Sequence, residues 1–220
     1  MYRDWADYLS PDIELHSIQM PGRGQRINEP CHTSMAGLLR DLQAAMASEL
    51  HRPFVFFGHS LGALVCFELA RLLRSQRMPG PLHLFVSGRR APQVPIINRR
   101  LYELPDAELL IELQRLKGTP REVLNDTELM RLTLPSLRAD FKLHETYSYV
   151  AEPALGIPIT AFGGAWDDCV SDEQLRAWQA QTTASFRYAL FPSGHFFLND
   201  CRSLLLQEVS HFLNMILAKL

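Results

Sequence analysis

Residues 54–74 read FVFFGHSLGALVCFELARLLR, and this stretch decides the fold. The apolar run at 54–57 predicts a buried strand, and the apolar spacing of residues 63–74 predicts a helix. Between them stands Gly58-His59-Ser60-Leu61-Gly62, a G-x-S-x-G pattern. In a strand–turn–helix context this pattern holds a serine on a sharp turn. We expect Cβ atoms two residues before and after the serine to clash there, which requires both glycines.

Ser60 is therefore the candidate nucleophile of the chain. The N–H of Leu61 opens the following helix, where the helix dipole favours negative charge, so it is the candidate donor of an oxyanion hole. A chance match in a glycine-rich loop is the alternative. The strand before the pattern and the helix after it favour the catalytic interpretation.

Composition excludes several classes of protein. The chain has 220 residues, 47% hydrophobic residues and a formal net charge of -2, which suits one globular domain and disfavours a nucleic-acid binder or a disordered chain. No apolar run has membrane-spanning length, and no signal peptide is recognisable. The four cysteines show neither C-x-x-C nor zinc-finger spacing. We therefore expect a reduced, cytoplasmic monomer.

Strands and helices alternate in the first part of the chain. Around the serine turn the sequence predicts a short helix at Met1–Leu9, a strand at Ile13–Met20, a helix at Ser34–Leu50 and a strand at Leu82–Val86. This alternation predicts an α/β fold with a mainly parallel sheet and helices on both faces.

A helical insertion interrupts the alternation. Between Leu104 and Tyr149 no buried strand is recognisable, and about four short helices are expected, one at Asp126–Leu134 and another that begins or kinks at Pro135. Long insertions near active sites are usually lids, although a plain helical subdomain is the alternative. We expect a core of residues 1–98 and 150–220 and a lid of residues 99–149.

The sheet resumes after the insertion. Strands are predicted at Ile157–Phe162 and Phe186–Phe191, on either side of a helix at Ser171–Thr182 with a capping box of Ser171 and Gln174. A closing helix follows from Asn199 or Asp200 to the C-terminus.

The residues around the last two strands supply candidates for a base and an acid. His195 follows the last strand in a glycine-bounded loop, late in the chain, as the order serine, acid, histidine requires. Asp167 and Asp168 follow the preceding strand, where the acid should stand. Spacing alone does not choose between these two aspartates.

Several motifs together resemble the type II thioesterases that serve nonribosomal peptide and polyketide synthases. The most specific are FVSGRRAP at 85–92 and GHFFL at 194–198, and the others are LHSIQMPGRGQR at 15–26, ADFKLHETYSY at 139–149 and FGGAWDDCVS at 162–171. The resemblance covers nearly the whole chain. It implies the α/β-hydrolase fold, and it places the acid at Asp167, where the aspartate of the family's G-G-x-x-D-x-x-V-S pattern falls. Family members often have proline at the position of Asp168, which further supports Asp167.

The resemblance implies an editing enzyme. Such enzymes hydrolyse acyl thioesters from the phosphopantetheine arm of carrier proteins, with no metal or cofactor. The helical insertion would then line an acyl channel with Met130, Leu134, Leu137 and Phe141, although these residues at helical spacing could equally form the lid's own core. Arg89, Arg90, Arg99 and Arg100 could meet an acidic carrier, but an ordinary solvated set is the simpler interpretation.

Two other functions stay open. A small-molecule carboxylesterase of the same fold would share the site, and a catalytically weak carrier-binding partner is conceivable. The second follows from a departure: the family has a strand and a glycine-rich loop, the source of a second oxyanion donor, before the position of Met1. We expect these N-terminal elements to be missing from the chain as given.

Overall fold

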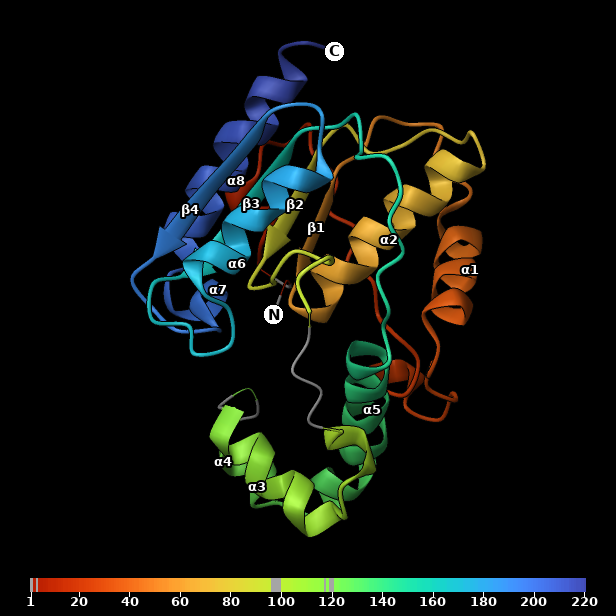
Figure 1. Ribbon diagram of the computed structural model, residues 1–220, viewed down its shortest axis with the longest axis vertical. Coiled ribbons are helices and arrows are strands. Elements are labelled where there is room, and N and C mark those ends of the chain that lie inside the picture. The colour runs from red at the N-terminus through yellow and green to blue at the C-terminus, as the bar shows by residue number, and fades with distance from the viewer. Residues whose placement is uncertain (1, 3, 96–99, 117, 119–120) are drawn as a thin grey trace. The chain divides into compact units, whose positions relative to one another are not determined.

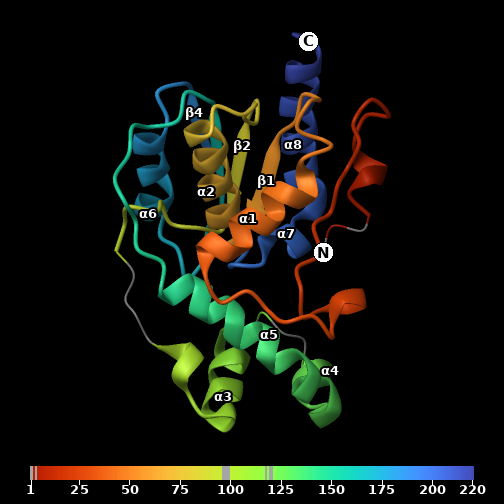
Figure 2. The ribbon, with the colours of Figure 1, turned by 90° about the vertical axis from the view of Figure 1, so that its right-hand side faces the viewer.

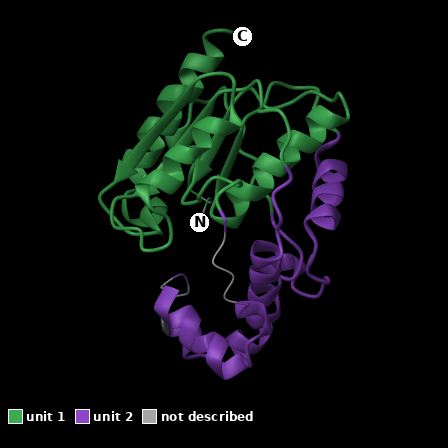
Figure 3. Ribbon diagram, viewed as in Figure 1, with its two compact units in different colours: residues 1–18, 48–94, 151–220 green, residues 19–47, 95–150 purple. Residues whose placement is uncertain are grey.

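The computed structural model describes the chain except for residues 1, 3, 96–99, 117, 119 and 120. The described residues form two compact units, which Figure 3 shows in different colours. Unit 1 contains residues 1–18, 48–94 and 151–220, and unit 2 contains residues 19–47 and 95–150. Residues 19–47, which the sequence led us to place in the core, thus group with the helical segment. The expected boundary at 98/99 lies outside the described residues.

Unit 1 contains a four-stranded sheet of order β1-β2-β3-β4, in which all neighbouring strands are parallel (Figure 1). The strands are β1 (Phe56–His59), β2 (Leu84–Ser87), β3 (Ile159–Gly164) and β4 (Phe186–Phe191). Since all four strands run the same way, their carboxyl ends share one edge of the sheet. That edge is where ligands bind in such folds.

Helices cover both faces of this sheet, as the sequence predicted. Figures 1 and 2 show α2 (Leu61–Ser75) and α6 (Asp172–Arg176) on one face and α8 (Arg202–Leu217) on the other. The short α7 (Phe197–Asp200) precedes α8. A buried cluster fills the α8 side and includes Phe85, Phe162, Phe191, Phe197, Leu205 and Leu206. The aromatic side chains of neighbouring strands thus hold the sheet against the closing helix.

Unit 2 is helical. Its helices are α1 (Met35–Met46), α3 (Asp106–Leu116), α4 (Arg121–Leu124) and α5 (Thr127–Glu145). A partly exposed ion pair and a buried carboxylate hold the unit together: Arg23 donates two hydrogen bonds to Asp140, at 3.0 and 2.9 Å, and buried Glu145 accepts from the N–H of Leu101 at 3.1 Å. Two-pronged arginine–carboxylate bonds are geometrically specific, so they fix residues 19–47 on α5.

The helix boundary expected at Pro135 was wrong, because α5 is continuous through this residue. Proline deprives the helix of one N–H donor. The hydroxyls of Thr133 and Ser136 donate to the carbonyls of Leu129 and Thr133, at 2.9 and 2.8 Å. Leu134 and Leu143 are among the buried residues of α5, so packing stabilises the helix on both sides of the proline.

Two predicted elements near the N-terminus also differ. Ile13–Met20 forms no strand, although its residues alternate, because no neighbouring strand pairs with it and most of its side chains are exposed. Of the helix expected at Met1–Leu9, only a 3-10 turn at Ala6–Tyr8 forms in the described part. Strands need partner strands, which a local pattern does not supply.

The helix predicted at Ser171–Thr182 is divided in two. The capping box of Ser171 and Gln174 is confirmed at the start of α6, but a 3-10 helix at Ala177–Gln181 follows. In the part of the chain that the structure describes, no helix has the length and apolarity needed to cross a membrane.

Candidate active site

Ser60 lies on a strained turn between β1 and α2. Its backbone angles are φ 52° and ψ -115°, a conformation that side-chain-bearing residues rarely adopt. A Cβ at Gly58 would overlap the carbonyl group of Gly62, so position 58 requires glycine. A Cβ at Gly62 would meet no atom within 4 Å, so the expected clash there was wrong. Backbone strain of this kind clusters at functional sites, so Ser60 stays the candidate nucleophile.

The turn is fixed to the neighbouring strand. The N–H of Ser60 donates to the carbonyl of Ser87, at the end of β2, over 2.8 Å. Leu61 is the first residue of α2, so its N–H is one of the amides that have no acceptor within the helix. The backbone therefore presents a serine and a free helix N-terminus at the same edge of the sheet.

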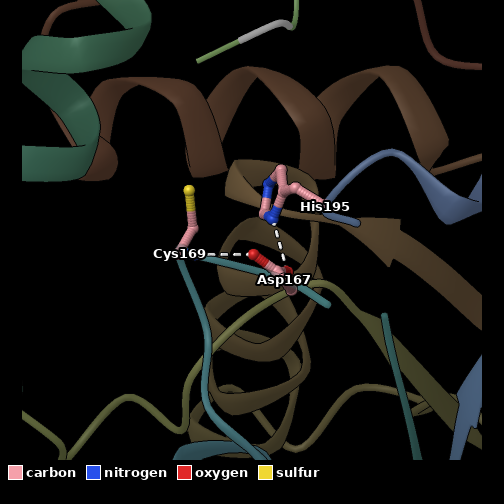
Figure 4. Close-up of side chains that lie close together, drawn as sticks. All are labelled: Asp167, Cys169 and His195. Carbon is pink, nitrogen blue, oxygen red and sulfur yellow. Dashed lines mark hydrogen bonds and ion pairs between the residues drawn. The ribbon is translucent and has the colours of Figure 1, made fainter. Parts of the chain in front are cut away.

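The structure brings Asp167 and His195 together. Asp167 follows β3, His195 follows β4, and the Nδ1–H of His195 donates to Oδ2 of Asp167 over 2.7 Å (Figure 4). The Asp167 side chain is fully buried, and the His195 side chain is 15% exposed. A buried carboxylate on Nδ1 leaves Nε2 as the ring nitrogen able to accept a proton.

The second carboxylate oxygen of Asp167 also accepts hydrogen bonds. Oδ1 accepts hydrogen bonds from the backbone N–H groups of Cys169 and Val170, at 2.7 and 3.2 Å. Asp168, the alternative acid, is exposed. These hydrogen bonds and the difference in burial favour Asp167 over Asp168 as the partner of His195, a choice that sequence spacing alone could not make.

Backbone contacts join the loops that contain these two residues. The N–H of Ala165 donates to Phe191, and that of Trp166 to Ser193, at 2.7 and 3.0 Å. A Cβ at Gly164 would overlap the carbonyl oxygens of Gly194 and Ser193, so the loops approach closely only because residue 164 is glycine. The hydroxyl of Ser193 also donates to Asp200 at 2.5 Å.

Comparison with known proteins decides the family. The family model of the thioesterase domain matches residues 1–217. The chain belongs to the thioesterase domain family.

Individual relatives agree with this assignment. The thioesterase is 35% identical to RedJ, a thioesterase of the prodiginine biosynthetic pathway in Streptomyces coelicolor, with a TM-score of 0.89 over 96% of this chain and 84% of that one. It is also 35% identical to the type II thioesterase BorB of the borrelidin biosynthetic cluster, with a TM-score of 0.87 over 96% and 85% of the two chains.

The name of a third relative indicates a different activity. Linear gramicidin dehydrogenase LgrE of Brevibacillus parabrevis is 43% identical over 203 residues, 91% of this chain and 77% of that protein. That name gives a dehydrogenase, but the present sequence contains no G-x-G-x-x-G dinucleotide-binding pattern. The family model and the solved structures therefore define this chain as a thioesterase, an enzyme that hydrolyses thioesters.

A second histidine, His59, lies beside the Asp167–His195 pair. His59 is buried, with Nδ1 2.9 Å from the hydroxyl of Ser87 and its ring 5.1 Å from that of His195. Burial, and then the nearby His195, lower the pKa of His59 to about 3, against an opposing effect of Asp167. A neutral ring therefore packs against the pair, and Gly88 is glycine because a Cβ would overlap that ring.

The predicted acyl-channel residues all belong to unit 2. Met130 and Leu134 are buried with Leu101, Leu109 and Leu113, whereas Leu137 and Phe141 pack half-buried against this cluster. The cluster is the core of the helical unit, which is the alternative that the sequence left open. Only the two half-buried side chains keep accessible surface for a ligand.

The arginines that could meet a carrier differ in their exposure. Arg89 is buried, with 3% exposure, and its carbonyl accepts from the indole N–H of Trp178 at 2.7 Å. Arg90 is half-buried, Arg100 pairs with Glu103 at 3.5 Å, and Arg99 lies outside the described residues. Burial of Arg89 removes it from any docking surface.

Proposed function

We propose that this thioesterase hydrolyses acyl thioesters of phosphopantetheinyl carrier proteins through Ser60, His195 and Asp167. The observation that supports this most is the buried Asp167–His195 hydrogen bond at the edge of the sheet where the strained Ser60 turn ends β1. The relatives named for antibiotic-type biosynthetic pathways support the class of substrate. Editing of misprimed or stalled carriers is the role that we assign to it.

The proposed reaction begins with attack of the Ser60 hydroxyl oxygen on the thioester carbonyl carbon. The hydroxyl proton passes to Nε2 of His195, and the carbonyl oxygen becomes an anion next to the N–H of Leu61. When the carbon–sulfur bond breaks, His195 returns that proton to the leaving sulfur, which gives the free thiol and an acyl-serine.

Water completes the cycle. His195 takes a proton from a water molecule, the resulting hydroxide attacks the acyl-serine, and the acid leaves as Ser60 regains its proton. Throughout, Asp167 holds the imidazole in one tautomer and stabilises its protonated form. Two backbone N–H groups on Oδ1 keep that carboxylate oriented.

Leu137 and Phe141 of the helical unit are our candidates for contact with the acyl chain. We further propose a cytoplasmic monomer whose partner is the carrier protein. Light scattering of the purified chain tests the monomer.

A substrate comparison tests the proposal against the carboxylesterase alternative. One acyl group is offered to the wild type as a carrier-protein thioester and as a p-nitrophenyl ester, and kcat/KM is measured for both. We expect a clear preference for the carrier. A preference for the simple ester would favour the carboxylesterase.

Two further measurements test the nucleophile. Ser60→Ala should lose about a million-fold in kcat while its circular dichroism stays unchanged. A fluorophosphonate probe should label the wild type and not the variant. Carrier binding without turnover or labelling in the wild type would instead indicate a non-catalytic binding partner.

A further inference from the structure

A cysteine lies next to the proposed acid and base. Among the residues that the structure describes, Asp167, Cys169 and His195 are the one group of three metal-ligating side chains whose ligand atoms all lie within 4.8 Å of one another. Figure 4 shows the Cys169 thiol and the His195 ring on the same side of the Asp167 carboxylate. Cys169 is exposed and forms no disulfide.

We propose that Asp167, Cys169 and His195 form an inhibitory binding site for a thiophilic divalent cation such as Zn²⁺. The three side chains supply one sulfur, one nitrogen and one oxygen, which are the ligand types that zinc prefers. Three protein ligands with one open position are typical of accessible zinc sites. Nothing in the proposed reaction uses the thiol, so the cation is a regulator and not a cofactor.

The geometry requires only small movements. Ligand atoms around a tetrahedral zinc ion stand roughly 3.5 Å apart, given bonds of about 2.0–2.3 Å. The 2.7 Å His195–Asp167 contact must therefore open slightly, and the widest separation in the group, at most 4.8 Å, must close by about 1 Å. The exposed Cys169 side chain can rotate to close it, while its backbone N–H stays on Oδ1 of Asp167.

The same residues could also bind the metal ion in a second way, which keeps the Asp167–His195 hydrogen bond. Histidines that bind metals usually donate their other ring N–H to a carboxylate, which is the contact already present here. In that arrangement Nε2 of His195 and the Cys169 thiolate bind the ion, and Asp167 orients the imidazole. Both arrangements need the thiol, so both predict the same effect of its removal.

Charge around the site acts in two directions. Arg90 interacts electrostatically with Cys169, and its positive charge opposes an incoming cation. The negative charge of the Asp167 carboxylate offsets that effect. Ligation would occupy the imidazole that the proposed reaction uses as its base. The binding site itself does not depend on the proposed function, whereas inhibition rests on it.

Cobalt spectroscopy tests the site without any activity. Co²⁺ is titrated into wild type, Cys169→Ser and, as a matched control, Cys31→Ser, which changes a half-buried cysteine of unit 2. We expect a near-ultraviolet thiolate-to-cobalt charge-transfer band in the wild type and in Cys31→Ser but not in Cys169→Ser. Absence of the band from the wild type, or its survival in Cys169→Ser, would overturn the proposed site.

Zinc inhibition tests the consequence. Hydrolysis of a p-nitrophenyl acyl ester is measured against free Zn²⁺, because the thiol product of a thioester would bind the metal. The rate of each protein is expressed as a fraction of its own metal-free rate. We expect Cys169→Ser to need roughly tenfold more Zn²⁺ for half inhibition than the wild type and Cys31→Ser. Equal sensitivity of all three would overturn the inhibitory role. A metal-free wild type that hydrolyses neither this ester nor the acyl-carrier thioester would contradict the proposed function and leave the cobalt result intact.

Discussion

The N–H of Trp166 donates to the carbonyl oxygen of Ser193 over 3.0 Å, and this bond joins the loop of Asp167 to the loop of His195. The two loops follow adjacent parallel strands, so their separation is set by the sheet and by the residues that let them touch. Gly164 is the residue that permits the contact, because a Cβ there would overlap two backbone carbonyls.

Gly164→Ala should therefore move the histidine loop. Backbone atoms cannot yield as a flexible side chain can, so we expect destabilisation of about 1–3 kcal/mol by urea unfolding. A displacement near 1 Å of His195 should also lower kcat by about 100-fold. Gly156→Ala is the matched control, since a Cβ there meets no atom within 4 Å. Equal stability and kcat in both variants would contradict this account of the loop contact.

Asp167 and Asp168 should differ sharply in function. Asp167→Asn replaces the carboxylate that accepts from Nδ1 of His195, so kcat should fall about 10⁴-fold. Asp168→Asn changes an exposed side chain and should stay near the wild-type rate. Steady-state kinetics on one acyl-carrier substrate decides the matter. A large loss at 168 with a small one at 167 would reverse the assignment of the acid.

The two glycines of the serine turn should respond differently to a methyl group. Gly58→Ala places a Cβ on the carbonyl of Gly62 and should destabilise the fold by about 1–3 kcal/mol. Gly62→Ala meets free space at the start of α2, where alanine is the better helix former, so stability should hold or rise by up to about 1 kcal/mol. Urea midpoints of both variants measure this. Similar losses in the two would show that the turn is tighter at 62 than the structure has it.

The half-buried residues of α5 should influence chain length. Phe141→Ala and Leu137→Ala should change the ratio of kcat/KM for long and short acyl groups by an amount equivalent to about 1–3 kcal/mol, because apolar contacts act per methylene. Leu132→Ala, at an exposed position of the same helix, should leave the ratio unchanged. If every acyl length responds alike, these side chains only stabilise the helical unit.

Acid should unfold the protein through its buried histidines. Burial lowers the pKa of His83 from 6.5 to about 4, with Nε2 of its ring 2.9 Å from the hydroxyl of Thr160. The unfolded chain therefore binds the proton first as the pH falls. Stability due to the neutral ring is present above pH 6.5 and is lost between about 6.5 and 4, with a slope of about 1.4 kcal/mol per pH unit.

His83→Gln should remove that part of the slope while it keeps a hydrogen-bonding group for Thr160. Urea unfolding at pH 7, 6 and 5 measures the dependence. The control is His211→Gln, which changes an exposed side chain and should keep the wild-type slope. An unchanged slope in His83→Gln would mean that His83 is protonated equally in both states.

The sequence by itself determined the features that depend on neighbours in the chain. The serine turn required a strand before it, a helix after it and a glycine at 58, all within residues 54–74. The alternation of strands and helices gave the parallel sheet, because a parallel connection needs a crossover helix. The capping box at Ser171 likewise depends only on residues that are close to one another in the chain.

Tertiary structure decided whatever depends on partners that are distant in the chain. The 13–20 alternation formed no strand because no strand pairs with it. Helix α5 is continuous across Pro135, where packing of buried residues stabilises it on both sides of the proline. Asp167 and Asp168 are equivalent in spacing. The family resemblance favoured Asp167, and the physical reason is the position of the His195 loop, 28 residues on, which contacts Asp167. The same contact brought Cys169 to the imidazole, although no cysteine spacing indicated a metal site.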